Sequence, residues 1–455
     1  MMTMSEIAQA SGGTLIGEDV LVQSVGTDSR RLEAGQLFVA IKGEHFDGHD
    51  YARGVLRQGA AAVLISDAIG VGPAVLVEDT RLALGKLAAH WREKFNIPVA
   101  AVTGSNGKTS VKEMLASILR VAAGSESAVL ATQGNLNNDL GLPLTLLRLR
   151  AQHRYAVVEM GMNHAGEIRY LTHIGHPDVA LVNNATSAHL GGLGSVEGVA
   201  KAKGEIFEGL AAGGTAVINA DDAFSGLWQS LAQQHRIVRF GLNAEAEVTA
   251  QYVLHPEGSD LQLHTPEGER SLRLHVAGLH NVRNALAACA VALSMQVSLD
   301  AVVTGLASFG GVKGRLQRRY GKQGALVIDD TYNANPASMR AAIDVLASQS
   351  GKRLLVMGDM GELGADESAL HAELGVYAKA AGLDGLYTLG TLTPETVRAY
   401  GDGASHYESV EDLVIALLPV LDANTSVLVK GSRFMRMERV VEQLQDNNKE
   451  KSYVA

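Results

Sequence analysis

Short apolar runs alternate with longer segments of helical periodicity through most of this chain. From Pro98 onward the runs VAAVTG, YAVVEMG, DVALVNN and TAVINADD repeat this arrangement. Apolar strands separated by helices are typical of a mainly parallel sheet that is covered on both faces. The pattern therefore predicts a central α/β domain whose ligands bind at the carboxyl ends of its strands.

The flanking segments predict two further domains and an addition to the central one. The N-terminal segment begins with a short helix, with Ser5 as its cap and Gly12 and Gly13 as its stop, and continues with the strands LFVAI and AAVLI. Between about 247 and 277, alternating strands with two PEG turns predict a β meander, which the helical run NVRNALAACAVAL closes. After the glycine-rich FGGVKGR, the strands LVIDD, RLLVMGD, GLYTLG and SVLVKGS alternate with helices, as in a Rossmann-like domain. We expect α/β domains over residues 1–84, 85–312 and 313–455.

Charge and cysteine content narrow the possible classes of protein. The 455 residues carry a formal net charge of -10, which argues against a nucleic-acid scaffold because such proteins need a basic face. The single cysteine, Cys289, lies in an apolar helical run, so disulfides and cysteine-ligated zinc are excluded and a buried, inert thiol is expected. The first residues lack a basic and apolar leader, and no run of about 18 apolar residues occurs. We expect a cytoplasmic protein without stable membrane insertion.

The segment VAAVTGSNGKTSVKEM carries the clearest chemistry, because a strand leads through a glycine-bearing loop into a helix. The standard phosphate-loop pattern is not fully met, since Val102 stands where that pattern has its first glycine. Backbone N–H groups at a helix N-terminus still suit phosphate oxygens, while Lys108 would reach the β- and γ-phosphates and Thr109 would bind Mg²⁺. A glycine turn with an incidental lysine is the alternative. The candidate ATP-binding residues of this loop are Gly104, Ser105, Asn106, Gly107, Lys108, Thr109 and Ser110.

The form TGSNGKT resembles the shortened phosphate loop of the Mur ligase family, and the resemblance extends over nearly the whole chain in the same three-domain order. It implies ATP and Mg²⁺ as cofactors and a small N-terminal domain that binds UDP. Glu159 and His189 would then bind magnesium, and Lys203 would do so as a carbamate, whose anionic oxygens replace the ammonium group. From the residues alone, the alternative for Glu159 is a charged strand-end residue at a turn, and the ordinary expectation for Lys203 is a solvated helical lysine.

The same resemblance assigns roles to residues of all three domains. Asn281 and Asn284 would approach adenine, Arg315 the phosphates and Asp330 the ribose, with helix capping as the alternative for Asn281. Since Arg315 and Asp330 belong to the third domain, the site would be complete only when the domains close and exclude water. The candidate substrate-binding residues, for which ordinary turns are the alternative, are Ser29, Arg30, Asn135, Asn137, Asn138, Asn333 and Asn335.

Other polar groups of the third domain have two interpretations. Strand-end residues of MGDMGELG and VLVKGSR, Asp359 and Lys430 among them, lie where a dipeptide could dock, and surface loop chemistry explains them nearly as well. For Arg318 and Arg319 we favour a solvated basic face over a role in binding.

Several segments, including DDTYNANP and EMGMNHAGEI, resemble the family member that adds D-alanyl-D-alanine. The resemblance implies an ATP-dependent amide ligase that joins this dipeptide to UDP-N-acetylmuramoyl-tripeptide through an acyl phosphate, in the last cytoplasmic step of peptidoglycan precursor synthesis. We expect a monomer. The alternatives are a sister ligase that adds a diamino acid, whose Asp-Asn-Pro-Arg segment is absent here, folylpolyglutamate synthase, which lacks this N-terminal domain, and an ATP-driven switch without ligation.

Overall fold

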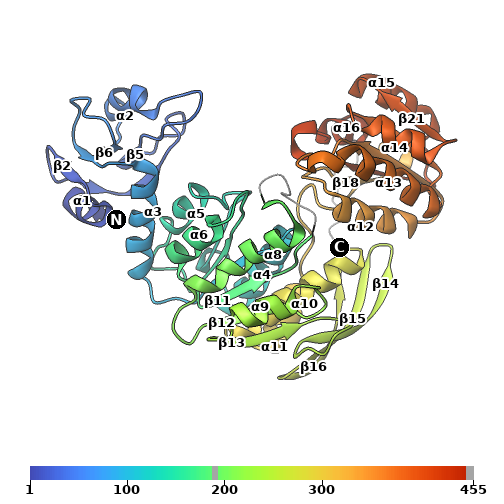
Figure 1. Ribbon diagram of the computed structural model, residues 1–455, viewed down its shortest axis with the longest axis horizontal. Helices are drawn as coiled ribbons and strands as arrows, with labels where there is room; N and C mark the ends of the chain where they lie inside the picture. The colour runs from blue at the N-terminus through green and yellow to red at the C-terminus, as the bar shows by residue number, and fades with distance from the viewer. Residues whose placement is uncertain (187–192, 447–455) are drawn as a thin grey trace.

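The computed structural model describes residues 1–186 and 193–446 as three α/β domains that follow one another along the chain. The N-terminal and C-terminal domains lie at opposite ends of the central domain (Figure 1). The fold class predicted from the apolar pattern is confirmed. Among the helices in the described ranges, none is long and apolar enough to cross a lipid bilayer.

The N-terminal domain is built on a five-stranded sheet of order β2-β7-β6-β5-β4, in which LFVAI and AAVLI supply the buried strands β5 and β6. The cap expected at Ser5 is wrong. Thr3 caps the first helix by accepting the Glu6 N–H at 3.3 Å, because Ser5 is held by Asp19, to which its hydroxyl donates at 2.6 Å. The elements are β1 (Met2–Thr3), α1 (Met4–Ser11), β2 (Thr14–Ile16), β3 (Leu21–Val22), β4 (Ser24–Gly26), β5 (Gln36–Val39), α2 (Ala52–Arg57), β6 (Ala62–Ile65) and β7 (Ala74–Leu76).

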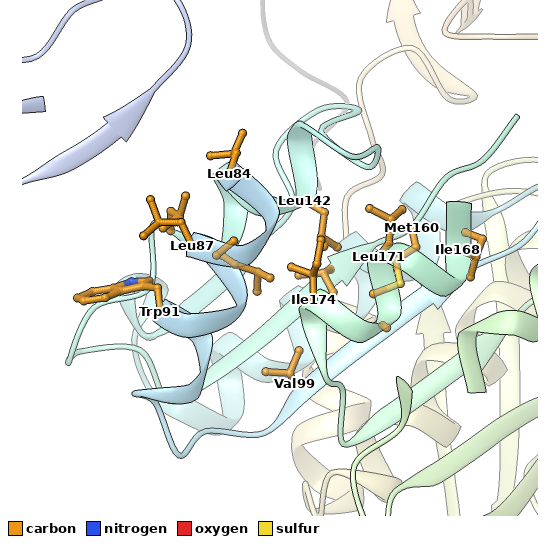
Figure 2. Close-up of a cluster of buried hydrophobic side chains, with 14 of the residues drawn as sticks. Leu84, Leu87, Trp91, Val99, Leu142, Met160, Ile168, Leu171 and Ile174 are labelled. Carbon is orange, nitrogen blue, oxygen red and sulfur yellow. The ribbon is translucent and has the colours of Figure 1, made fainter. Parts of the chain in front are cut away.

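Helix α3 (Thr80–Glu93) joins the first two domains. The expected boundary between residues 84 and 85 falls inside this helix. Its apolar residues Leu84, Leu87 and Trp91 belong to the same buried cluster as Leu142 and Leu171 of the central domain (Figure 2). Because α3 is one continuous helix, we propose that the domain boundary lies at one of its ends.

The central domain contains a six-stranded, fully parallel sheet of order β13-β12-β11-β8-β10-β9. The four strands expected from the sequence form its middle, where nearly every side chain is buried. The edge strands β9 and β13 were not predicted, because β9 is short and β13 has two arginines in RIVRF. The elements are β8 (Val99–Thr103), α4 (Lys108–Ala123), β9 (Val129–Ala131), α5 (Gly141–Leu146), β10 (Tyr155–Glu159), α6 (Glu167–Gly175), β11 (Val179–Val182), α8 (Val196–Gly204), β12 (Thr215–Asn219), α9 (Ser225–Leu231) and β13 (Arg236–Phe240).

The predicted meander is a three-stranded antiparallel sheet attached to the central domain (Figure 1). Its strands are β14 (Thr249–His255), β15 (Gly258–Thr265) and β16 (Gly268–Leu274), and helices α10 (Leu279–Ser294) and α11 (Leu299–Ala307) follow. Cys289 is fully buried within α10, and burial raises the pKa of its thiol to about 12. The expectation of an inert, buried thiol agrees with this environment.

The C-terminal domain has a six-stranded sheet of order β17-β18-β22-β19-β20-β21, parallel except for β17. The expected solvated face of Arg318 and Arg319 on β17 is wrong. Arg319 pairs with the buried Asp329 at 3.0 Å, and Arg318 pairs with Glu257 of the meander at 3.2 Å. The elements are β17 (Gln317–Tyr320), β18 (Leu326–Asp330), α12 (Pro336–Ala347), β19 (Lys352–Gly358), α13 (Glu367–Ala380), β20 (Gly385–Leu389), α14 (Thr393–Tyr400), β21 (Ala404–Tyr407), α15 (Val410–Leu417), β22 (Thr425–Lys430) and α16 (Glu438–Leu444).

Candidate active site

The glycine-bearing loop lies between β8 and α4, at the carboxyl edge of the central sheet. Gly107 takes a left-handed conformation with φ of 80°, and a Cβ there would collide with the side chains of Asn183 and Asn284. Only glycine suits this position, both in conformation and in space. The Asn106 N–H donates to Asn184 Oδ1 at 2.8 Å, so the end of the neighbouring strand β11 fixes the loop.

Lys108 is the first residue of α4, and its Nζ donates to the carbonyl oxygen of Gly104 at 2.6 Å. Burial lowers the pKa of Lys108, the Arg315 charge lowers it further and Glu159 raises it. A partly buried lysine whose ammonium group curls over its own loop is placed to meet the charge of a bound phosphate.

Thr109 and Glu159 form an oxygen-rich cluster beside the loop. The Thr109 hydroxyl donates to Glu159 Oε2 at 3.0 Å and accepts from Arg315 Nη2 at 3.1 Å. Asn137 Nδ2 donates to the other carboxylate oxygen at 2.8 Å, and Glu159 is 2% exposed. A hydroxyl and a buried carboxylate next to a phosphate loop are the hard oxygen ligands that Mg²⁺ prefers, so this donor set fits the ion.

Lys203 lies near the end of α8 with its side chain about 1% exposed. Its amine has a pKa well below the usual value because it is buried and because the charge of Lys108 lies close by. The solvated helical lysine considered from the sequence is therefore wrong. Lys201, on another face of the same helix, is exposed and pairs with Glu197 at 2.7 Å. His189 lies outside the described residues.

A cavity of about 430 Å³ opens beside the phosphate loop, between the central and C-terminal domains. Asn281 and Asn284 of α10 both line it, and Asn284 Nδ2 donates to Asn281 Oδ1 at 3.2 Å. Gly278 occupies the N-cap position of α10, so capping does not explain Asn281. Ser110, in the first turn of α4, also lines the cavity.

Arg315 and Asp330 bring the C-terminal domain to this cavity. The Arg315 guanidinium lies 4.3 Å from the ring centre of Tyr332, which holds it over the phosphate loop. Asp330 is bound to Lys430 Nζ at 2.6 Å, and burial raises the pKa of its carboxyl group. Lys430 thus lines the same cavity as Arg315 and Asp330.

The candidate substrate residues are spread over all three domains. Asn137 reaches Glu159, as described, and Asn335 Nδ2 donates across the domain interface to Asn106 Oδ1 at 2.8 Å. Asn335 also caps α12, and Asn138 Oδ1 accepts the Gly141 N–H at 2.9 Å. The local bonds of Asn138 and Asn335 agree with the turn interpretation. A contact of these asparagines with substrate remains a proposal.

The other substrate candidates lie away from the phosphate loop or in turns. Arg30 is exposed in the N-terminal domain beside Ser29, and its guanidinium forms two hydrogen bonds with Asp28. Asn135 is exposed, and Asn333 Oδ1 accepts the Ala334 N–H at 2.9 Å. Asp359, by contrast, accepts three backbone N–H groups before and at the start of α14, as a structural residue does.

Sequence reasoning missed several cavity residues that follow the predicted strands. DVALVNN ends in two asparagines and TAVINADD in an asparagine and two aspartates, and the strand-end rule could have found them. His280 and Arg283 of α10 carried no separate signal. The missed lining residues include Asn183, Asn184, Thr186, Asn219, Asp221, Asp222, His280 and Arg283.

Comparison with known proteins identifies the class. Three Mur ligase family descriptions match the chain in the order of its domains: the family's catalytic domain over residues 21–92, the middle domain over 102–292 and the glutamate ligase domain over 314–433. The chain belongs to the Mur ligase family.

Particular relatives resemble the chain over its full length. UDP-N-acetylmuramoyl-tripeptide–D-alanyl-D-alanine ligase of Escherichia coli (strain K12) is 45% identical, over 98% of this chain and 99% of the relative. A crystal structure of MurF from Acinetobacter baumannii superposes with a TM-score of 0.92 at 40% identity, over 97% of this chain and 98% of that one. MurF ligase from Thermotoga maritima in complex with ADP gives a TM-score of 0.83 at 29% identity, over 94% and 98%.

Proposed function

We propose that this protein is an ATP-dependent amide ligase that adds D-alanyl-D-alanine to UDP-N-acetylmuramoyl-tripeptide. The terminal carboxylate of the tripeptide takes the γ-phosphoryl group of ATP, and the dipeptide amine then attacks the acyl phosphate. ADP, phosphate and a pentapeptide precursor leave. Phosphorylation is required because an unactivated carboxylate would have to expel oxide. The main support is the convergence of Lys108, Thr109 and Glu159 beside a cavity, in a chain 45% identical throughout to such a ligase.

Lys108 and Arg315 are the positive groups that meet the triphosphate. Hydrogen bonds to Gly104 and Thr109 hold the two groups at the phosphate loop, where they would stabilise the charge that develops on the transferring phosphoryl group. The ADP complex of the Thermotoga relative supports adenine nucleotide use by the proposed site. Asn281 and Asn284 of α10 also line the cavity, Asn284 directly beside Gly107, and their amide groups would offer donors and acceptors to the base.

Magnesium, when bound, supplies charge neutralisation at the β- and γ-phosphates. Thr109 and Glu159 would hold it, and Asn137 fixes the carboxylate by donating to its second oxygen. His189 is proposed as a further ligand by resemblance to the family. In Lys203, the lowered amine pKa favours the neutral form, which is the form that reacts with carbon dioxide. We propose that its carbamate, formed with release of one proton, turns this buried group into an anionic oxygen ligand.

The two peptide substrates meet where the domains converge. The N-terminal domain, with Ser29 and Arg30, is proposed to hold the uridine end of the precursor. Asn333 and Asn335 of the C-terminal domain are proposed to face the dipeptide. The hydrogen bond from Asn335 to Asn106 joins that domain to the phosphate loop. Closure of the domains about this contact would bring the amine to the acyl phosphate and exclude water. We propose a cytoplasmic monomer.

The substrate requirement of ATP cleavage tests this function. With ATP and Mg²⁺, we expect rapid release of ADP and phosphate only when UDP-N-acetylmuramoyl-tripeptide and D-alanyl-D-alanine are both present. The mass of the product should equal that of the tripeptide precursor plus the dipeptide minus one water.

Two controls separate the alternatives. UDP-N-acetylmuramoyl-dipeptide with a diamino acid should give no product, whereas a sister ligase would use this pair. ATP cleavage at the same rate without either peptide substrate would indicate a switch and would contradict ligation.

A further inference from the structure

A second lysine of the phosphate-loop helix is completely buried. Lys112 lies one helical turn after Lys108 on α4, and its side chain has no exposure to solvent. A buried ammonium group is costly unless hydrogen bonds and charge compensate for lost water, and a methionine of similar volume would pack there more easily. Lys112 is not among the residues that line the nucleotide cavity. A buried charge at this place, away from the cavity, calls for another role than direct phosphate contact.

Thr132 receives the Lys112 ammonium group and links it to Glu159. Lys112 Nζ donates to the Thr132 carbonyl oxygen at 2.7 Å and also contacts the carboxylate of Glu113. Thr132 follows β9 at the carboxyl edge of the sheet, and its own N–H continues the parallel ladder by donating to Val157 at 3.1 Å. In a regular parallel ladder, the Glu159 N–H would donate to the Thr132 carbonyl. The Glu159 N–H donates at 2.9 Å to the Thr132 hydroxyl, and the carbonyl points to Lys112.

We propose that Lys112 is a positioning residue for Glu159 and acts through Thr132. The ammonium group holds the Thr132 carbonyl, the Thr132 hydroxyl holds the Glu159 backbone, and the Glu159 carboxylate is thereby fixed against the Thr109 hydroxyl. Partners that orient a metal ligand are commonly worth tenfold to a hundredfold in metal affinity. This inference rests on the proposed magnesium site and adds two residues, Lys112 and Thr132, that set its geometry.

Magnesium-dependent ADP binding tests the proposal without turnover. Titration calorimetry measures the Kd for ADP at a series of Mg²⁺ concentrations. The quantity compared between variants is the Mg²⁺ concentration at which half of the change in ADP affinity has occurred. We expect Lys112→Met to raise this concentration about tenfold or more while the Kd for ADP without metal stays within about twofold of the starting protein. Thr132→Val, which removes the hydroxyl but keeps the shape, should act in the same direction.

Two control variants separate positioning from general damage. Thr132→Ser keeps the hydroxyl and Lys201→Met removes an exposed lysine, so both should behave like the starting protein. If Lys112→Met does not fold, Thr132→Val decides the question. Unchanged Mg²⁺ dependence in a folded Lys112→Met or Thr132→Val protein would overturn the positioning role. If Mg²⁺ does not affect ADP binding by the starting protein, the proposed metal site fails, and this inference fails with it.

Discussion

Replacing Lys108 with alanine should slow ligation by about a thousandfold, because preorganised positive groups at a developing phosphoryl charge contribute on this scale. Lys108 Nζ lies 2.6 Å from the Gly104 carbonyl oxygen and is therefore already placed at the loop, a position that alanine leaves empty. Formation of the pentapeptide precursor, followed by mass spectrometry under saturating substrates, measures the loss in kcat.

The matched control for this substitution is Lys201→Ala. Lys201 is exposed and pairs only with its helical neighbour Glu197 among the contacts described, so its loss should leave ligation unchanged. Thermal unfolding of both variants shows whether the fold is intact. A folded Lys108→Ala protein that ligates at the original rate would contradict the assignment of the loop to the triphosphate.

Replacing Lys203 with alanine should slow ligation by about a hundredfold or more, because it removes the proposed anionic ligand beside the phosphates. Burial and the nearby charge of Lys108 lower the pKa of this amine, which favours the neutral form that reacts with carbon dioxide. In carbon dioxide-depleted buffer the starting protein should lose activity and regain it when bicarbonate is added. Lys203→Ala should not respond to bicarbonate.

Carbon-13 NMR provides a readout of the modification itself. Protein equilibrated with ¹³C-labelled bicarbonate should give a carbamate signal that Lys203→Ala lacks. Lys201→Ala should keep the signal, since its exposed ammonium group is paired with Glu197. Full activity of a folded Lys203→Ala protein, independent of bicarbonate, would rule out the carbamate role.

The buried middle of each sheet could be predicted from the sequence, and its edges could not. Interior parallel strands such as β8 and β12 are nearly continuous apolar runs, because both faces are covered. The edge strands β17 and β21 have the polar sequences QRRY and ASHY, whose strand structure depends on pairing with a neighbour. Their positions therefore follow from tertiary contacts more than from local pattern.

The phosphate loop could be predicted because its groups are contiguous. The Lys430 to Asp330 pair joins residues 100 positions apart, and the Arg315 to Thr109 bond joins residues 206 apart, so spacing gives no signal for either. Arg319 was misread for the same reason. Its partner Asp329 lies on the adjacent strand β18, and a run of arginines without that strand is indistinguishable from a solvated face.

The most direct measurement of the central claim follows an oxygen atom from the tripeptide. UDP-N-acetylmuramoyl-tripeptide labelled with ¹⁸O in both oxygens of its reacting carboxylate is incubated with ATP, Mg²⁺ and D-alanyl-D-alanine. If the carboxylate is phosphorylated, one ¹⁸O passes to each phosphate released and one stays in the new amide. Phosphate without label, formed together with pentapeptide product, would contradict the acyl-phosphate account.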